Sequence, residues 1–97
     1  MSRVKLSEEE IKDNLKELND WKVEGKLLKR SFKFENFAEA LEFVNKVGEI
    51  AEKADHHPDI TFGWGYADIE LTTHDTGGLT QNDFDVAKKT DFLLVIS

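Results

Sequence analysis

The chain has 97 residues, with thirteen basic and twenty acidic side chains, a formal net charge of −7 at pH 7, and no cysteine. This length predicts one domain over residues 1–97, and the lack of cysteine excludes disulfides, thiolate nucleophiles and cysteine-based zinc sites. The acidic balance argues against binding to nucleic acid or to an anionic membrane surface, because both require clustered Lys and Arg. The N-terminal stretch MSRVKLSEEE is highly charged and no long apolar run follows, so we expect a cytoplasmic protein without a signal peptide or membrane span.

Residues 6–18, LSEEEIKDNLKEL, have the pattern of an amphipathic helix. Ser7 and Glu10 stand three residues apart and form a capping box at its start. The apolar residues recur at helical spacing on one face: Ile11, Leu15 and Leu18. One side of this helix is therefore expected to pack on the rest of the domain.

Residues 21–35, WKVEGKLLKRSFKFE, alternate between apolar and polar side chains on both sides of a Gly25-Lys26 turn. This pattern predicts a β-hairpin. One face of the return strand consists of Leu28, Arg30, Phe32 and Phe34. The charged Arg30 within that apolar face indicates a position at the edge or rim of the core.

Residues 36–54, NFAEALEFVNKVGEIAEKA, predict a second helix, with Asn36 and Glu39 as a capping pair. Its apolar residues fall on two adjacent stripes, Phe37, Leu41, Val44 and Gly48 on one and Phe43, Val47 and Ile50 on the other. This band is wider than one buried face requires. We therefore expect one stripe to pack on the sheet and Phe43, Val47 or their neighbours to contact another subunit.

Residues 58–74, PDITFGWGYADIELTTH, alternate again and predict a second hairpin, in which the glycines of FGWG permit a bulge or tight bend. Residues 79–96 predict a third helix, with Thr80 as its cap and Asp83 at its third position. The order is α-β-β-α-β-β-α. It predicts an α+β fold, a four-stranded antiparallel sheet with the helices packed on one face.

The three histidines of the chain are candidates for a common site. His57 precedes Pro58, which disfavours helical backbone, so the second helix should end near residue 54. Adjacent side chains on extended backbone point in opposite directions, so His56 and His57 suit two sides of one object. The second hairpin returns the chain and can bring His74 beside them.

Three interpretations of this cluster are open on the residues alone. The histidines can be surface loop residues without a common role. They can be zinc ligands, although no HxH or HExxH spacing is present. They can also perform acid–base catalysis without a metal, because imidazole gains and loses a proton near neutral pH.

The sequence EKADHHPDI, followed by THDTGGLTQNDF, resembles the pterin-4a-carbinolamine dehydratase family. That family's pattern is E-K-x-x-H-H-P, a hairpin, and then T-H-x-x-x-G-L-[ST]-x-x-D. The matching residues are Glu52, Lys53, His56, His57, Pro58, Thr73, His74, Gly78, Leu79, Thr80 and Asp83. Trp21 and the stretch FKFENFAEALEF are similar too, whereas Trp64-Gly65-Tyr66-Ala67 departs from the family's pattern at the hairpin tip.

The resemblance implies dehydration of a 4a-hydroxytetrahydropterin to quinonoid dihydropterin and water, in the recycling of a tetrahydropterin released by an aromatic amino acid hydroxylase. It implies neither a metal nor an organic cofactor. The implied catalytic residues are His56, His57 and His74, with His56 and His74 moving protons and His57 mainly placing the substrate; which of the first two is the acid stays open. The implied substrate-binding residues are Glu52, Asp55, Pro58, Trp21, Thr73 and Asp83.

The chain is also expected to form a homo-oligomer, a dimer or a tetramer built from two dimers. The segment ITFGWGY has no charge and no proline, whereas natural edge strands usually carry such protection. This strand is therefore either central in the sheet or paired with its symmetry mate. The alternative function from another class is a non-enzymatic binding or assembly module on the same fold, which would need a helical or sheet surface rather than the histidines.

Overall fold

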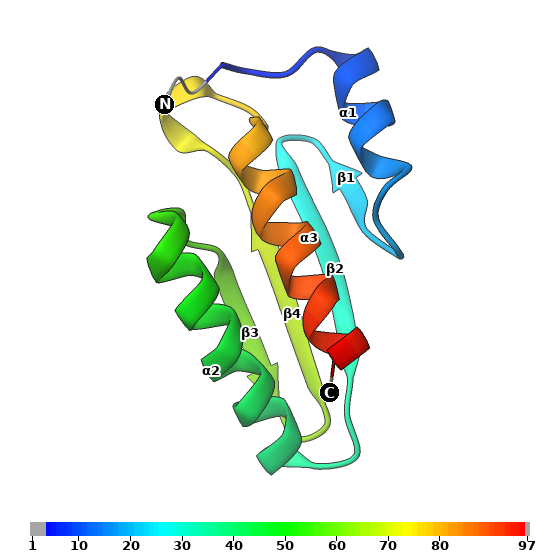
Figure 1. Ribbon diagram of the computed structural model, residues 1–97, viewed down its shortest axis with the longest axis vertical. Coiled ribbons are helices and arrows are strands. Elements are labelled where there is room, and N and C mark those ends of the chain that lie inside the picture. The colour runs from blue at the N-terminus through cyan, green and yellow to red at the C-terminus, as the bar shows by residue number, and fades with distance from the viewer. Residues whose placement is uncertain (1–3, 97) are drawn as a thin grey trace.

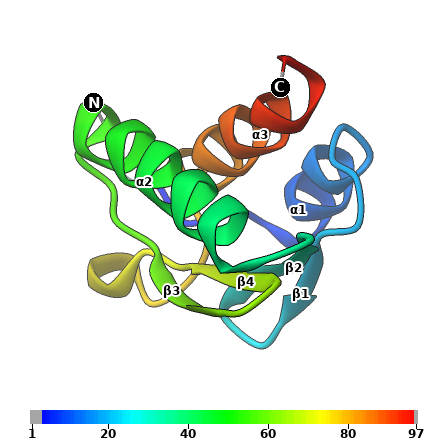
Figure 2. The ribbon, with the colours of Figure 1, turned by 90° about the horizontal axis from the view of Figure 1, so that it is seen from below.

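The computed structural model describes residues 4–96 as one four-stranded antiparallel sheet covered on one face by three helices (Figures 1 and 2). The elements in chain order are α1 (Glu8–Leu15), β1 (Lys22–Glu24), β2 (Leu27–Lys33), α2 (Phe37–Ala54), β3 (Asp59–Gly63), β4 (Tyr66–Leu71), the short 3₁₀ helix η1 (His74–Thr76) and α3 (Gln81–Ile96). The sheet order is β1-β2-β4-β3. The predicted α+β class and the order α-β-β-α-β-β-α are confirmed. Among the described residues, no helix combines the length and apolar character needed to cross a membrane.

The predicted helix starts are confirmed for α1 and α2. Ser7 and Glu10 form the full capping box, in which each side chain accepts a hydrogen bond from the other residue's backbone N–H. At α2 the Asn36 side chain accepts from the Glu39 N–H at 2.9 Å. The Glu39 carboxylate accepts instead from the N–H of Glu35, one residue before the position that a capping box would use.

The core lies between the inner face of the sheet and the helices. The alternation of β2 and β4 directs these side chains inward: Leu28, Phe32, Ala67, Ile69 and Leu71. Arg30 points to the same side, and its guanidinium ion-pairs with Asp91 of α3 at 2.8 Å and lies 4.4 Å above the ring of Phe32. Its position at the rim of the apolar core is as predicted.

The expected use of the two α2 stripes is wrong. Phe43 and Val47 are buried in the core, and the centroids of the Phe43 and Phe32 rings are 4.7 Å apart. Phe37 and Leu41 of the other stripe remain exposed, at 45% and 39%. The rings of Phe32 in β2 and Phe34 just after it pack against Phe43, and that contact sets the rotation of the helix.

The second hairpin closes in a two-residue turn. Gly63 pairs with Tyr66, which leaves Trp64 and Gly65 between the strands, and Gly65 takes a φ of +80° that favours glycine. Trp64 therefore does not extend β3 and is 73% exposed. The segment ITFGWGY is not one strand, because it leaves β3 at Gly63 and enters β4 at Tyr66. Its first part lies in the edge strand β3 rather than at the centre of the sheet, and pairing of this edge with a symmetry mate stays a prediction.

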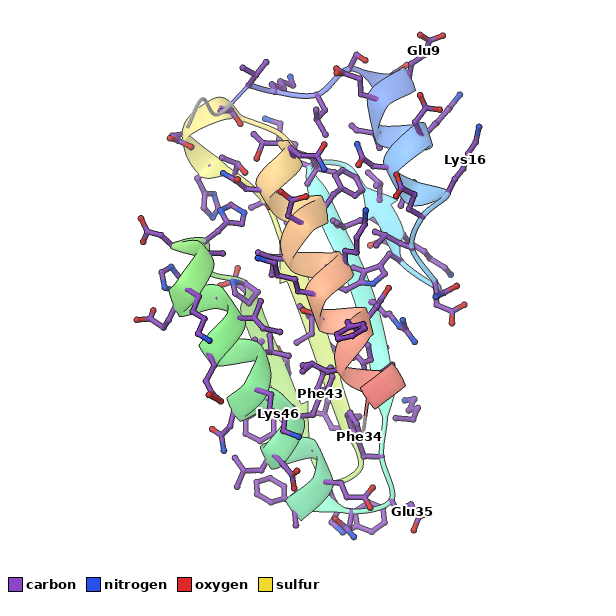
Figure 3. The ribbon with its side chains drawn as sticks, in the orientation of Figure 1. Glu9, Lys16, Phe34, Glu35, Phe43 and Lys46 are labelled. Carbon is purple, nitrogen blue, oxygen red and sulfur yellow. The ribbon has the colours of Figure 1, made fainter. Side chains whose placement is uncertain are left out.

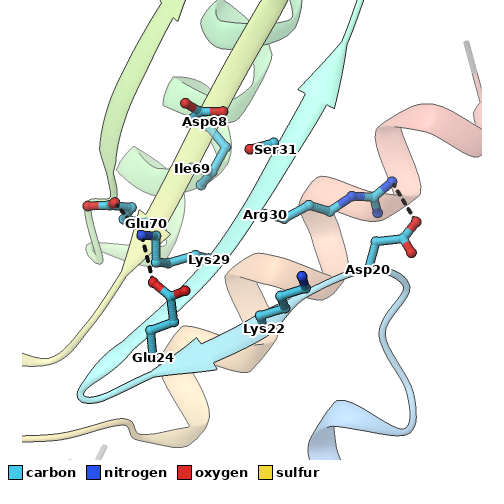
Figure 4. Close-up of a pocket in the computed structure, with 9 residues that line it drawn as sticks. All are labelled: Asp20, Lys22, Glu24, Lys29, Arg30, Ser31, Asp68, Ile69 and Glu70. Atoms are coloured by element: carbon cyan, nitrogen blue, oxygen red, sulfur yellow. Dashed lines mark hydrogen bonds and ion pairs between the residues drawn. The ribbon is translucent and has the colours of Figure 1, made fainter.

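The outer face of the sheet carries paired charges. Lys29 lies between Glu24 at 3.0 Å and Glu70 at 3.4 Å (Figure 4). The hydrogen bond from Lys29 lowers the pKa of the Glu24 carboxyl, and the same bond raises the pKa of the Lys29 ammonium. A hollow of about 510 Å³ on this side is lined by such pairs. Its charges largely neutralise one another, and none of the three histidines lines it.

Candidate active site

The three histidines line one pocket of about 320 Å³ at the end of the sheet. The lining residues are His56, His57, Thr72, Thr73, His74 and Asp75. The pocket lies where the connection from α2 to β3 meets the segment that follows β4. The predicted convergence of His74 on the adjacent pair is therefore present in the fold.

The end of α2 positions His56 and His57. Asp55 takes left-handed backbone, with φ 51° and ψ 43°, and its N–H still bonds to the helix, so the chain leaves α2 sharply after Ala54. The helix end agrees with the prediction drawn from Pro58. His56 then turns inward and is only 4% exposed, whereas His57 faces outward.

A closed loop positions His74. Thr73 and Gly78 form an isolated β-bridge, and the Thr76 hydroxyl donates to the backbone oxygens of both residues, at 3.1 and 3.0 Å. Gly77 provides the left-handed residue that ends η1, with φ 70°. His74 is exposed at the start of this loop, and within residues 4–96 its ring makes no hydrogen bond or ion pair.

Behind the pocket, the fully buried carboxylate of Asp83 joins three segments of the chain. Oδ1 lies 2.5 Å from His56 Nε2, and Oδ2 accepts from the Thr73 hydroxyl at 2.8 Å and the Thr80 N–H at 3.0 Å. A carboxylate only accepts hydrogen bonds, so His56 carries its proton on Nε2. Since the Thr73 hydroxyl donates to Asp83, the Thr80 hydroxyl 2.9 Å away donates to Thr73.

His57 is held in a similar way but at the surface. Its Nε2 pairs with the carboxylate of Glu52, one turn back on α2, and both side chains are more than half exposed. In both pairs the carboxylate is hydrogen-bonded to Nε2, so Nδ1 is the ring nitrogen that the carboxylate does not occupy. The site thus contains two tethered imidazoles and the untethered ring of His74. An arrangement of this kind can place a substrate and transfer protons to and from it.

The other predicted substrate-binding residues lie at different depths. Thr73 lines the pocket, while Asp83 lies behind His56 and Glu52 beside His57. Asp55 and Pro58 are absent from the pocket lining and instead shape the exit from α2.

Trp21 was expected to line the cleft, and the structure places it elsewhere. Its ring is 7% exposed and packs against Phe32, and its indole N–H donates to Asp91 at 2.8 Å. A buried indole N–H requires a hydrogen-bond acceptor, and the partly buried carboxylate of Asp91 provides it. Trp21 is therefore a core residue of this chain.

Three residues of the site were not singled out as site residues from the sequence. Thr72 and Asp75 line the pocket, and Thr80 completes the hydrogen bonds of Asp83. Thr80 is predicted as a helix cap and matches the family's motif, but the sequence assigns it no role in the site. The threonine and aspartate three residues apart signalled a helix start, but nothing in that spacing shows that the carboxylate also reaches His56.

The model of the pterin 4 alpha carbinolamine dehydratase family matches residues 4–93. A curated protein from Rubrobacter xylanophilus is 52% identical over 89 residues, which cover 91% of this chain and 83% of that protein. One from Sulfolobus acidocaldarius is 48% identical over 86 residues, which cover 89% of this chain and 94% of that protein. Both have the assigned name pterin-4-alpha-carbinolamine dehydratase. The chain belongs to the pterin 4 alpha carbinolamine dehydratase family.

Two solved structures share the fold. A protein from Brucella melitensis, described as a transcriptional coactivator/pterin dehydratase, superposes with a TM-score of 0.88 at 35% identity, covering 93% of this chain and 98% of that chain. A pterin dehydratase-like protein, described as a RuBisCO assembly factor in the alpha-carboxysome, superposes with a TM-score of 0.66 at 26% identity. The match covers 79% of this chain and 92% of that chain. The resemblance identified from the histidine motifs is confirmed at the level of the family.

The buried contacts of Asp83 predict the effect of replacing it. In Asp83→Asn one carboxylate oxygen becomes an amide NH₂, so at least one of the three donors now facing Asp83 loses its acceptor. We expect the free energy of unfolding to fall by about 1–3 kcal/mol in urea titrations. Asp85→Asn, on the exposed side of the same helix, should change it by less than about 0.5 kcal/mol. Equal stabilities of the two variants would contradict this account of the buried contacts.

Proposed function

We propose that this chain catalyses the dehydration of 4a-hydroxytetrahydropterin to quinonoid dihydropterin and water. One observation supports this most: three histidines line a single pocket, two of them oriented by carboxylates, in a chain of the pterin 4 alpha carbinolamine dehydratase family. We further propose that it acts in the cytoplasm, on the product of an aromatic amino acid hydroxylase.

The chemistry requires one acid and one base. The C4a–O bond breaks and its electron pair leaves with oxygen, which takes up a proton and departs as water. The lone pair of N5 forms the N5=C4a double bond, and N5 gives up its proton to the base. No net proton is gained or lost and nothing is oxidised or reduced, so the reaction needs no redox partner.

We assign the proton transfers to His56 and His74 and substrate placement mainly to His57. Asp83 fixes the tautomer of His56 and holds it against the pocket, which suits a group that must present one defined nitrogen. The untethered ring of His74 can change its protonation state without breaking a contact. The Glu52 tether leaves His57 at the rim, where it can contact one edge of a flat ring.

The alternative, a non-enzymatic assembly module, is supported less well. It would use a surface, and it gives no reason for a buried carboxylate to orient His56. The assembly role described for the 26%-identical structure is a property of that protein.

The direct test is a dehydratase assay on freshly generated 4a-carbinolamine in the presence of EDTA. We expect turnover to exceed the uncatalysed rate, and to be unchanged by chelation, because acid and base are both side chains. Among the described residues no group of three His, Cys, Asp or Glu side chains is arranged to hold a metal ion. Loss of turnover on exhaustive chelation, with recovery on adding zinc, would defeat the acid–base mechanism.

Single substitutions separate the proposed roles. His74→Ala should lower kcat by about 10²–10⁴-fold, the usual range for loss of a general acid or base. His57→Ala should act mainly by raising KM. Both side chains are exposed, so both variants should remain folded by circular dichroism. A fall in kcat for His57→Ala as large as that for His74→Ala, with KM unchanged, would show that the division of roles is wrong.

We also propose that the chain forms a homo-oligomer through two surfaces. The first is the edge strand β3, which carries no charge or proline after Asp59 and can pair with its own copy across a two-fold axis. The second is the groove between α2 and α3, where two hollows of about 340 and 650 Å³ share Leu93. Two such contacts in one molecule would generate a tetramer of paired dimers.

The charges of the α2/α3 groove support self-association. One end carries Glu39 and Glu42. They line the same hollow as Phe34, Phe43 and Lys46, which Figure 3 labels. The other end carries Lys53, Lys88 and Lys89 around Ile50 and Phe92, and Phe92 is 59% exposed. A two-fold axis across the groove brings the acidic end of one copy against the basic end of the other.

Light scattering at micromolar protein tests the assembly. We expect a mass of two or four times the 11.1 kDa of one chain. Phe92→Glu should reduce it by disrupting the helix contact, whereas Glu9→Lys, on the exposed side of α1, should not. A clean monomer for the unaltered protein would rule out self-association at that concentration.

A further inference from the structure

A second hollow of about 260 Å³ adjoins the histidine pocket. It is lined by Lys26, Leu27, Thr72, Thr73, His74 and Gly77. Thr72, Thr73 and His74 line both hollows, so the second one lies on the other side of the segment that follows β4. His74 is the one proposed proton-transfer residue that borders both.

The register of the sheet explains why Lys26 is there. Leu28 of β2 pairs with Leu71 of β4, and the two strands are antiparallel. Each residue that precedes Leu28 is therefore level with a residue that follows Leu71 by the same number of positions. Leu27 is thus level with Thr72, and the tight turn made by Gly25, with φ 58°, and Lys26 lies level with Thr73 and His74. The hairpin that the sequence predicts therefore delivers a lysine to the rim of the site.

Lys26 differs in charge from the acidic side chains around the histidines. It is the one lysine or arginine that lines either hollow in residues 4–96, while Glu52, Asp75 and Asp83 surround the histidines. Its side chain is exposed, and within the described chain it makes no ion pair, unlike Lys29 on the same hairpin. Its positive charge is therefore available to a ligand.

The chemistry of the substrate connects the two hollows, if the proposed function holds. The reacting atoms are C4a and N5, and C6 is bonded directly to N5. A histidine that exchanges a proton at N5 or at the 4a oxygen therefore lies beside the point where the C6 substituent leaves the ring. With His74 in that role, the substituent starts next to the Lys26 hollow.

We infer that the hollow formed by Lys26, Leu27 and Gly77 receives the C6 substituent of the pterin, and that Lys26 favours substituents ending in an anionic group, phosphate or carboxylate. The chain has a net charge of −7 and acidic side chains lie around the histidines, so an unpaired lysine beside the reacting atoms is a specific attraction for an anion. A neutral substituent would gain little from it. Lys26 is thus a specificity residue that does not take part in the proton transfers.

The test compares three carbinolamines that differ only at C6: a methyl group, a hydroxymethyl phosphate ester, and a substituent ending in a carboxylate. We measure kcat and KM for the unaltered protein, Lys26→Gln and Lys26→Glu. Lys33→Gln is the matched control, because Lys33 is an exposed lysine at the far end of β2 and lines neither hollow.

We expect Lys26→Gln to raise KM for the two anionic substrates by about three- to tenfold, within the range of an exposed ion pair strengthened by hydrogen bonding. Lys26→Glu should raise it further, and the methyl substrate should be unaffected. The preference should weaken as salt is added. A response to only one anionic substrate would assign the site to that group.

Two results overturn the inference while leaving the proposed function intact: turnover of the methyl substrate with no effect of Lys26 on either anionic one, or equal effects on all three. An equal effect of Lys33→Gln would show that only overall charge matters, and would overturn it too. Failure of the folded, unaltered protein to turn over any of the three would instead defeat the proposed function, and the inference with it.

Discussion

The site depends on one buried carboxylate. Asp83 is completely shielded from water and receives hydrogen bonds from His56, Thr73 and the backbone of Thr80. These partners belong to three segments: the exit from α2, the end of β4 and the start of α3. A buried carboxylate is costly unless its oxygens are hydrogen-bonded, so the three segments are constrained to meet where Asp83 lies. The same constraint gives His56 a defined tautomer and brings His74 to the pocket through its neighbour Thr73.

A second aspartate on α3 links other segments of the chain to the helix layer through hydrogen bonds. Asp91, two turns beyond Asp83, accepts from the indole of Trp21 and the guanidinium of Arg30, both at 2.8 Å. These contacts tie the chain before β1 and the middle of β2 to the helix layer. One helix therefore holds the histidine pocket through Asp83, and holds Trp21 and the middle of β2 through Asp91. This division explains why Trp21, despite its place in the family resemblance, lies in the core.

The sequence predicted what local patterns determine and missed what depends on contacts between distant segments. Caps at Ser7 and Asn36, the helix end before Pro58 and both hairpins followed from neighbouring residues. The choice between the two apolar stripes of α2 did not, because both satisfy helical periodicity and only the rings of Phe32 and Phe34 select Phe43 for burial. Likewise, the histidine motif predicted the cluster, whereas the link from Asp83 to His56 spans 27 residues and leaves no local signal.

The central claim is that Asp83 fixes His56 with its proton on Nε2. Nitrogen NMR of the histidine rings at neutral pH tests it most directly, in the unaltered protein and in Asp83→Asn. We predict that in the unaltered protein His56 is almost entirely the Nε2–H form, hydrogen-bonded to the carboxylate. In the variant the amide oxygen should stay with its two donors, Thr73 and the Thr80 N–H, which turns the amide NH₂ toward His56 Nε2, so the ring should lose this tautomeric bias while His57 does not change. A His56 ring that is mainly the Nδ1–H form, or one that is identical in both proteins, would contradict the account.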